Sequence, residues 1–356
     1  MEEVVRVGIM GSAAIAKKNA VALQRSSSCR LVAIASRNES KAKAWCEELG
    51  VTLRVVDYEG MVADPEVDAV YVPLPTMLHL EWVLKLAAAK KHVLVEKPVG
   101  VTTADVEKMI AACREHGVAI MDGTMFMHHA RFALMSRLFD DVLHWKCTRV
   151  TSAFSFYGGD DFLAKGNVRT RADADPLGAL GDLGWYCARI TLAAFRYEAP
   201  VSVVARLRDE SDDGVPFELD VDVEFSGDRR ATFHASFKHD FRQWFEAFSR
   251  NDYGAARVVR CSDFVIPRRE ETTEFEIEEL PSPPTVQHDT ILLTSKTVVP
   301  VGPCSQERDM WDAFASLCRG DLERRAFFEK ATLLTTQILS AAITSIQNGG
   351  ASTPVV

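Results

Sequence analysis

Apolar runs alternate with segments of helical spacing through the first part of the chain. Five runs predict strands: Val4–Met10, Arg30–Ser36, Ala69–Pro73, His92–Glu96 and Val118–Asp122. Four segments between them predict helices: Ala13–Arg25, Ser40–Leu49, Leu78–Lys90 and Thr103–His116. This order of strand, helix and strand is typical of a parallel sheet wound by right-handed crossovers. We therefore expect a doubly wound α/β domain over residues 1–124.

The pattern changes after residue 146, where β-rich runs follow one another at short spacing. These runs are Cys147–Tyr157, Val201–Leu207, Glu218–Phe225 and Ala231–Lys238. Short alternating strands of this kind predict a mainly antiparallel sheet. The prolines of Pro281–Pro284 predict an extended surface loop, and Ser305–Cys318 and Arg325–Gln347 predict two amphipathic helices. Residues 125–356 are thus expected to form a second, α+β domain.

Composition narrows the class of protein. The chain has 356 residues, which is enough for about two domains at roughly 150 residues each. It is 47% hydrophobic and 26% charged, which is ordinary for a folded protein. Asp and Glu number 50 against 41 Lys and Arg, so the net charge of −9 argues against a general nucleic-acid binder.

Neither targeting signals nor metal motifs are apparent. The amino terminus lacks the pattern of a signal peptide, and the apolar stretch Val67–Leu86 is interrupted before it reaches the ~20 residues that a membrane span needs. The eight cysteines form no C-x-x-C pair and no Cys/His cluster at metal-ligand spacing. We expect reduced thiols, no bound metal, no membrane contact and a cytoplasmic location.

The first strand runs into a turn that lies on the dinucleotide-binding template G-x-G-x-x-G/A. Gly11 permits the tight turn, and Ala13 replaces the middle glycine with the next smallest residue. The helix that follows would direct its N–H groups, near Ala14 and Ile15, at a pyrophosphate. The alternative is a turn of small residues with no ligand.

The end of the second strand indicates which cofactor would bind. NAD-specific folds place an acidic residue there to bind the ribose hydroxyls, but Ser36 and Arg37 occupy this end. A hydroxyl and a guanidinium favour a 2′-phosphate and hence NADP. Lys41 is a further candidate phosphate contact. Arg37 could instead be a solvated loop cation.

Two later strand ends also carry candidate cofactor contacts. Pro73, Leu74 and Pro75 fix the chain direction where a cofactor edge would lie, and His79 follows on the next helix. His79 could equally be a packed or capping histidine. Glu96 and Lys97 end another strand, at the edge where this fold places its ligands. Lys97 is a candidate catalytic residue, or half of a surface ion pair with Glu96.

Taken together, these motifs resemble the glucose-fructose oxidoreductase/inositol dehydrogenase (Gfo/Idh/MocA) family over nearly the whole chain. The branch most similar contains dimeric dihydrodiol dehydrogenase, NADP-dependent D-xylose dehydrogenase and plant homologues. The resemblance implies a Rossmann domain and a second domain with an open-faced sheet. It is carried, in order, by Gly8-x-x-Gly11, Ala35–Arg37, Pro73–His79, Glu96–Pro98, Gly123–Met125 and Gly178–Tyr186.

The resemblance also implies a catalytic set. Lys97 would lie beside the nicotinamide, with Asp182 and Tyr186 brought over it from the second domain. A phenol with an unperturbed pKa near ~10 can act near neutrality beside a cation, and Tyr186 would then protonate the alkoxide as hydride arrives. Asp182 would orient substrate hydroxyls or Lys97. The alternatives are that Asp182 caps a helix and that Tyr186 is a buried core aromatic.

The remaining implications concern the pocket, the assembly and the activity. Similar loops in the family line the substrate pocket, which here gives Phe126, His128, Arg131, Arg169 and Asp173. Two departures, Ala13 and an Ala130 where relatives usually have Pro, affect the cofactor loop and the pocket wall. A homodimer through the open face of the second sheet is implied as well.

We therefore expect an NADP-dependent oxidoreductase that transfers a hydride between the nicotinamide and an alcohol or carbonyl of a sugar or dihydrodiol. The alternative is a catalytically silent, NADP-sensing regulator on the same fold. An NAD-dependent glycosidase is a third class, but it calls for an acidic end to the second strand and a Gly/His-rich pocket motif, and the sequence has neither.

Overall fold

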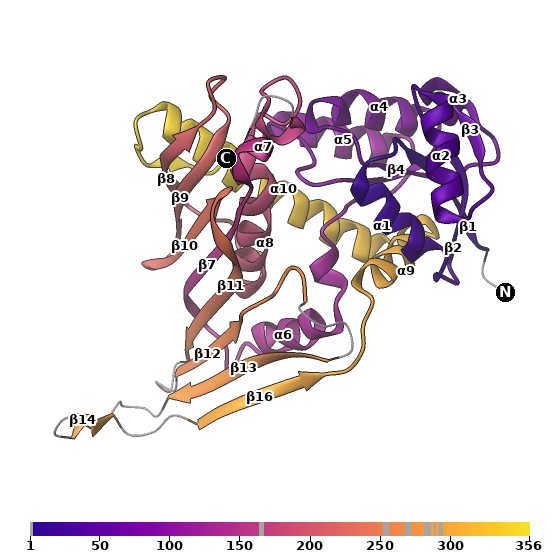
Figure 1. Ribbon diagram of the computed structural model, residues 1–356. Coiled ribbons are helices and arrows are strands. Elements are labelled where there is room, and N and C mark those ends of the chain that lie inside the picture. The colour runs from indigo at the N-terminus through magenta and orange to yellow at the C-terminus, as the bar shows by residue number, and fades with distance from the viewer. Residues whose placement is uncertain are drawn as a thin grey trace. The chain divides into compact units, whose positions relative to one another are not determined.

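The structure is a computed structural model that describes residues 3–163, 167–251, 256–267, 272–280, 286–287, 290–291 and 295–356. Within it the chain forms two compact units (Figure 1). The first unit contains Met1–His128 and Ser305–Thr336, and the second contains His129–Cys304 and Gln337–Val356.

The first unit is built on a parallel sheet in the strand order β3-β2-β1-β4-β5-β6. Its strands are β1 Val5–Met10, β2 Cys29–Ala35, β3 Arg54–Val56, β4 Ala69–Val72, β5 His92–Val95 and β6 Ile120–Asp122. Its helices are α1 Ala14–Leu23, α2 Glu39–Leu49, α3 Tyr58–Ala63, η1 Thr76–Leu78, α4 His79–Ala88, α5 Thr103–Glu115, η2 Met125–His128 and α9 Gln306–Cys318. The predicted strands and helices all form. The three residues of β3 and the six of α3 were not predicted, because segments so short carry no readable period.

The end of the chain also contributes to the first unit, with α9 and the part of α10 Leu322–Gln347 that extends to Thr336. Helix α9 packs against α1 and η2, and the indole of Trp311, which has no exposed surface, donates a hydrogen bond to Asn19 of α1 at 3.1 Å. The units therefore divide the chain differently from the expected division into 1–124 and 125–356. An amphipathic helix shows in its sequence that it covers a core, but not which core it covers.

The second unit contains a nine-stranded sheet in the order β16-β13-β12-β11-β7-β10-β9-β8-β17. Its strands are β7 Cys147–Tyr157, β8 Ser202–Glu210, β9 Pro216–Phe225, β10 Arg229–Ser236, β11 Lys238–Arg250, β12 Ala256–Cys261, β13 Thr273–Leu280, β16 Ser295–Val301 and β17 Thr353–Pro354. A separate two-stranded sheet joins β14 Val286–Gln287 to β15 Thr290–Ile291. The expected antiparallel character is confirmed for all neighbours in the large sheet except β7 and β10, which pair in parallel. The predicted loop at Pro281–Pro284 lies outside the described residues.

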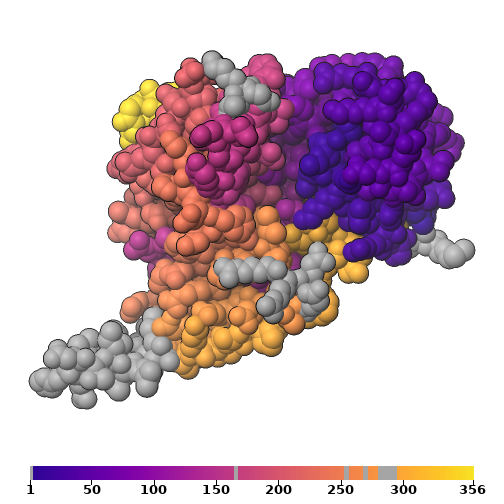
Figure 2. Space-filling model, viewed as in Figure 1, coloured from indigo at the N-terminus to yellow at the C-terminus, as the bar shows by residue number. Residues whose placement is uncertain are grey.

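Helices η4 Leu180–Gly184 and α8 Trp185–Ala194 pack on this sheet, and α6 Ala130–Asp140 contacts β13. The second unit also contains α7 Gly159–Leu163, η3 Val168–Thr170 and the last turns of α10 Leu322–Gln347. Every residue of α8 is buried, and α8 packs on β7, β10 and β11. Along β9, buried apolar residues alternate with accessible acidic ones, so the acidic side chains point to the opposite face. Figure 2 shows the surface of the chain in the same view as Figure 1.

Two further features bear on the expectations from sequence. None of the described helices combines the length and the apolar character that a membrane crossing requires. All eight cysteines carry free thiols, in agreement with the expectation of reduced cysteines.

Candidate active site

The turn between β1 and α1 has the features of a phosphate-binding loop. Gly11 has φ of +101°, a left-handed conformation that favours glycine. Ala13, at the amino-terminal cap of α1, is extended and provides no side-chain cap, and both Ala13 and Ala14 are exposed. The N–H groups of the first turn are thus oriented as an anion site requires. Ala13 has ordinary backbone angles (φ −64°, ψ 159°), so the lack of a second glycine causes no strain here.

Tyr58, the first residue of α3, lies beside this loop, and no motif in the sequence singles it out. A Cβ added at Gly11 would lie 3.3 Å from Leu74 Cδ2 and 3.7 Å from the Tyr58 hydroxyl. Burial raises the pKa of Tyr58, and the nearby positive charge of Arg37 partly offsets this. Gly11, Leu74, Tyr58 and Arg37 therefore meet at the carboxyl edge of the parallel sheet.

The three polar candidates after β2 have different surroundings. The Ser36 hydroxyl donates to the Asn38 carbonyl at 2.9 Å and accepts from the Asn38 N–H at 3.1 Å, so it already holds its own turn. Asn38 in turn caps α2 by accepting from the Lys41 N–H at 2.9 Å. The side chains of Arg37 and Lys41 are exposed. Arg37 is therefore the cation best placed for a 2′-phosphate, whereas Ser36 would first have to give up turn contacts.

His79 holds two strand ends together. It is 1% exposed, its Nε2 lies 2.8 Å from the Leu74 carbonyl, and its Nδ1 lies 3.1 Å from the carbonyls of Pro98 and Val99. Both ring nitrogens thus face backbone carbonyl oxygens of the loops after β4 and β5, and the ring joins these two loops, as the packed alternative describes. A cofactor contact for His79 stays a prediction. Pro73 and Leu74 are buried in the first of these loops, and Pro75 is partly exposed.

A chain of buried hydrogen bonds fixes the backbone at Lys97. Trp311 donates to Asn19, Asn19 donates to the Tyr71 hydroxyl at 2.9 Å, and Tyr71 donates to Glu96. The second carboxylate oxygen of Glu96 accepts from the Lys97 N–H at 3.1 Å. Glu96 is 8% exposed, so it anchors this strand end from the interior. Lys97 itself is half-buried and precedes a cis proline.

The segment after β6 is held by the first unit. A Cβ at Gly123 would lie 2.9 Å from Glu96 Oε1, so only glycine fits against that carboxylate. Phe126 is 1% exposed, and the ring of His128 stacks on Phe328 with centroids 5.4 Å apart. These contacts are packing contacts. A substrate contact for Phe126 or His128 stays a prediction.

In the second unit, three predicted site residues do come together. Arg169 Nε lies 3.0 Å from Asp182 Oδ2. Asp182 raises the pKa of Arg169 most strongly, and Asp175 and Tyr186 raise it to a smaller extent. Arg169 is therefore cationic throughout the working pH range. Tyr186 is 5% exposed and packs 5.7 Å from Phe154. A fixed cation thus acts on both Asp182 and Tyr186.

The backbone of this cluster is irregular. Residues Leu180–Gly184 form a π-helical turn that leads into α8, a feature often found at functional sites. Asp182 lies within this turn, so it is not the helix cap considered as the alternative. Gly178 begins the turn with φ of +47°, and a Cβ there would lie 2.2 Å from the Pro216 carbonyl oxygen.

Two residues assigned to the pocket from sequence have other roles. Asp173 is 68% exposed and pairs with Arg171, not with Arg169. The Arg131 guanidinium is 1% exposed and donates to the Asp263 carboxylate at 2.6 Å and to the Asp263 carbonyl at 2.8 Å. Such a buried, fully engaged arginine holds the second unit together and is not available to a substrate.

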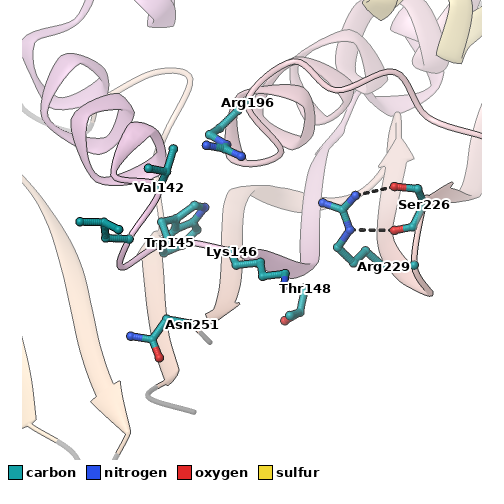
Figure 3. Close-up of a pocket in the computed structure, with 10 residues that line it drawn as sticks. Val142, Trp145, Lys146, Thr148, Arg196, Ser226, Arg229 and Asn251 are labelled. Carbon is teal, nitrogen blue, oxygen red and sulfur yellow. Dashed lines mark hydrogen bonds between the residues drawn. The ribbon is translucent and has the colours of Figure 1, made fainter. Parts of the chain in front are cut away.

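The second unit also has a pocket of about 600 Å³ away from these residues (Figure 3). It is lined by Val142, Leu143, Trp145, Lys146, Thr148, Arg196, Ser226, Gly227, Arg229 and Asn251. Arg229 donates to the Ser226 carbonyl at 2.7 Å and hydroxyl at 2.8 Å, and it pairs with Glu198 at 2.5 Å. None of the candidate catalytic residues lines this pocket.

Comparison with known proteins decides the family. Residues 5–124 match GFO_IDH_MocA, described as an oxidoreductase family with an NAD-binding Rossmann fold. A D-xylose 1-dehydrogenase (NADP(+)) of Haloferax volcanii is 32% identical over 242 residues, which cover 67% of this chain and 71% of that protein. The chain belongs to the Gfo/Idh/MocA oxidoreductase family.

Further relatives of this Gfo/Idh/MocA chain act on other sugars. A dTDP-3,4-didehydro-2,6-dideoxy-α-D-glucose 3-reductase of Actinomadura kijaniata is 35% identical over 186 residues, or 52% of this chain and 54% of that protein. The crystal structure of a 3-ketoreductase from the same organism, in complex with NADP and TDP-benzene, has a TM-score of 0.80 at 25% identity and covers 96% of this chain and 98% of that chain.

A more distant structure agrees in fold alone. An aldose-aldose oxidoreductase from Caulobacter crescentus has a TM-score of 0.80 at 20% identity, covering 99% of this chain and 100% of that chain. The resemblance inferred from sequence and the expected fold class are thus confirmed, and the chain is an oxidoreductase. Its candidate catalytic residues are divided between the units: Lys97 belongs to the first, and Asp182 and Tyr186 belong to the second.

Proposed function

We propose that this oxidoreductase uses NADP to interconvert a CH–OH group and a carbonyl on a sugar. The observation that carries the proposal is the cluster of Arg169, Asp182 and Tyr186, which combines a proton-transfer group with polar groups that bind hydroxyls. The relatives named above support a sugar substrate, because they include a D-xylose dehydrogenase and a dTDP-sugar reductase.

The cofactor proposal rests on the fit of the first unit to a phosphorylated dinucleotide. The uncapped start of α1 suits a pyrophosphate, and Gly11 permits close approach of the backbone. The exposed guanidinium of Arg37 suits a 2′-phosphate. NADP supplies the nicotinamide that gives or accepts the hydride. The use of NADP by the xylose dehydrogenase and the 3-ketoreductase agrees with this choice.

Tyr186 is the residue that we assign to proton transfer. Its phenol would give a proton to the substrate oxygen during reduction and take it back during oxidation. The positive charge of Arg169 favours the phenolate that remains after the proton leaves, because the two groups interact electrostatically. The sequence analysis expected Lys97 alone to stabilise the Tyr186 phenolate. In this proposal Arg169 also supplies that positive charge, from within the second unit.

Asp182 has two connected roles in this proposal. Its Oδ2 holds Arg169, and as an ionised carboxylate with further acceptor capacity it can accept a hydrogen bond from a sugar hydroxyl. Its side chain is 15% exposed, so part of it remains reachable. Lys97, whose backbone is anchored through Glu96, stays our proposed second catalytic group, as the family resemblance implies.

The regulator alternative receives no support from these comparisons. The named relatives are dehydrogenases and reductases, and this chain retains Lys97 together with Tyr186. A trans-dihydrodiol substrate rests only on the branch of the family that the sequence resembles. It is therefore retained as an arm of the experiment.

A screen of the purified protein tests the proposed function. In one direction we would measure the reduction of NADP+ in the presence of pentoses, hexoses or trans-dihydrodiols. In the other direction we would measure the oxidation of NADPH in the presence of free or dTDP-linked keto-sugars. We expect turnover with at least one sugar and a strong preference for NADP over NAD. Turnover with dihydrodiols alone would contradict the substrate class. NADP binding with no turnover on any of these compounds would favour the regulator.

A further inference from the structure

A group of metal-binding residue types lies outside the candidate active site, on the open face of the second unit's sheet, the face through which the family resemblance implies a homodimer. Glu218 and Asp220 are on β9, His234 is on β10, and His239 follows at the start of β11. In the β9–β10 ladder, Asp220 is opposite His234 and Glu218 is opposite Ser236. Because side chains two residues apart point to the same face of a sheet, the β9 and β10 members share one face.

The distances among three of these side chains approach those of a metal site. One ligand atom each from Glu218, His234 and His239 lies within 4.8 Å of the other two. His239 Nε2 is 3.0 Å from Glu218 Oε1, and the two imidazole rings have centroids 5.5 Å apart. Zinc bonds of about 2.0–2.1 Å place tetrahedral ligand atoms roughly 3.4 Å apart. The side chain of His239 is 58% exposed, so it has room to move its ligand atom closer to those of Glu218 and His234.

The fourth residue gives His234 a suitable orientation. His234 Nδ1 lies 2.9 Å from Asp220 Oδ1. The tautomer with its proton on Nδ1 donates to Asp220 and keeps a lone pair on Nε2. Metal-bound histidines usually donate their second ring N–H to a carboxylate in this manner. Asp220 is itself held by Arg208, whose Nε lies 2.7 Å from Asp220 Oδ2.

We propose that Glu218, His234 and His239 bind one divalent transition-metal ion, with Zn²⁺ as the type, and that Asp220 positions His234. Two imidazoles and one carboxylate suit zinc and its neighbours, whereas Mg²⁺ and Ca²⁺ require mainly oxygen ligands. The local charge also favours a cation: Glu218, Asp220 and Asp209 outnumber Lys238 and Arg208, and Lys238 is paired with Asp209. The bound ion would join β9, β10 and β11.

The sequence analysis expected no metal, because no Cys/His cluster has ligand spacing along the chain. The sheet assembles these ligands from three strands, and in the sheet order β7 lies between β10 and β11. The proposal is independent of the proposed oxidoreductase function, since none of these residues belongs to that site.

Calorimetric titration of the full-length protein with ZnCl₂ tests the site, after removal of metals with a chelator and of the chelator by dialysis. We expect one ion per chain, a higher melting temperature with Zn²⁺, and no comparable effect of Mg²⁺. His239→Ala should weaken zinc binding at least tenfold, and Asp220→Asn should weaken it by about 10- to 100-fold without abolishing it. His144→Ala removes a similarly exposed histidine beside a carboxylate and serves as the matched control.

Three outcomes would overturn the proposal. The first is the absence of zinc binding at micromolar concentrations in the parent protein. The second is binding that His239→Ala leaves unchanged, which would point to thiols or other surface groups. The third is an equal loss in His144→Ala. Because His239 is exposed, its replacement should leave the metal-free protein folded, and the melting temperature without metal checks this directly.

Discussion

Four arginines show how burial separates structural from functional roles of the same residue type. Arg131 and Arg189 are 1% and 0% exposed, and a guanidinium in such a place must be engaged by the protein. Arg131 is bound by Asp263, and Arg189 lies 5.2 Å from the ring of Trp185. Arg37 is exposed and Arg169 is 44% exposed. Only the exposed pair can exchange water for a ligand.

The proposed proton donor is tested by Tyr186→Phe. The substitution keeps the ring that packs on Phe154 and removes only the hydroxyl. Because general acid–base catalysis supplies about 10²- to 10⁴-fold, we expect kcat to fall by that factor while NADP affinity and melting temperature stay close to the parent values. Tyr157→Phe, at a tyrosine that is 65% exposed, is the control. A kcat within about threefold of the parent would identify Tyr186 as a core aromatic.

The electrostatic role of Arg169 is tested through the pH–rate profile. Arg169→Gln removes the positive charge that favours the Tyr186 phenolate and frees the Asp182 carboxylate. We expect the limb of the profile that reports Tyr186 to move to higher pH, with a higher KM for substrate. Arg171→Gln, in the same loop, removes an arginine paired with exposed Asp173. It should change neither the pH–rate profile nor the KM for substrate. Identical profiles for the two variants would argue against the proposed interaction.

Cofactor choice is tested by Arg37→Ala. A charge-assisted bond to the 2′-phosphate contributes about 1.5–3 kcal/mol, so its loss should raise the KM for NADP roughly 10- to 100-fold. The KM for NAD, which lacks that phosphate, should change little. Arg30→Ala, an exposed arginine on β2, controls for the loss of a surface charge. Equal effects of Arg37→Ala on the two cofactors would contradict the assignment.

At the scale of elements, irregular backbone positions the candidate catalytic residues of the second unit. The π-helical turn Leu180–Gly184 carries Asp182 just before the first turn of α8, where Tyr186 lies. In the first unit, the loops after β4 and β5 are joined by His79, and buried hydrogen bonds connect α9, α1, β4 and β5 to the Lys97 backbone. The candidate residues therefore lie on positions that several elements determine together.

Gly178→Ala tests the turn that begins this π-helical segment. A methyl group there would collide with the Pro216 carbonyl oxygen, and alanine would also be strained at φ of +47°. We expect a loss of more than about 1 kcal/mol in the free energy of unfolding, measured by denaturant titration. Gly214→Ala is the control. Gly214 also has a positive φ, of +78°, but a Cβ there would lie 3.8 Å from Glu210 Oε2 and closer to no other atom, so this substitution tests the backbone strain alone. Equal losses would show that the close contact contributes nothing.

At the scale of the whole molecule, one buried histidine predicts a pH dependence of stability. Burial, followed by the charge of Arg325, lowers the pKa of His92 from 6.5 to about 4. The Ala119 N–H donates to His92 Nδ1 at 2.9 Å, which requires that nitrogen to be unprotonated. The unfolded chain takes up this proton below pH 6.5 and the folded chain does so only near pH 4. Stability is therefore lost progressively as pH falls through that window.

The expected loss between pH 7 and pH 5 is about 2 kcal/mol from this residue. Urea midpoints measured over that range should fall in the parent protein and fall less in His92→Asn, whose side-chain oxygen can still accept from the Ala119 N–H. His116→Asn, at the end of α5, is the control and should keep the parent slope. If the urea midpoint of His92→Asn falls with pH as steeply as that of the parent protein, His92 is not the cause of the pH dependence.

The fold class, the strands and helices predicted for the first unit, and the family can all be recognised from the amino-acid sequence. These features depend on local period and on motif order, which are written along the chain. The same motifs predict Arg37, Lys97, Asp182 and Tyr186 as site residues, because each lies at a strand end or within a motif.

The packing of whole elements is what shows which core α9 covers, which arginines are buried, and that Arg169 pairs with Asp182. It also brought Tyr58 to Arg37 and two histidines to Glu218. These are contacts between residues far apart in the chain. Their formation depends on how whole elements pack, and no local pattern of hydrophobic and polar residues records the partner across that distance.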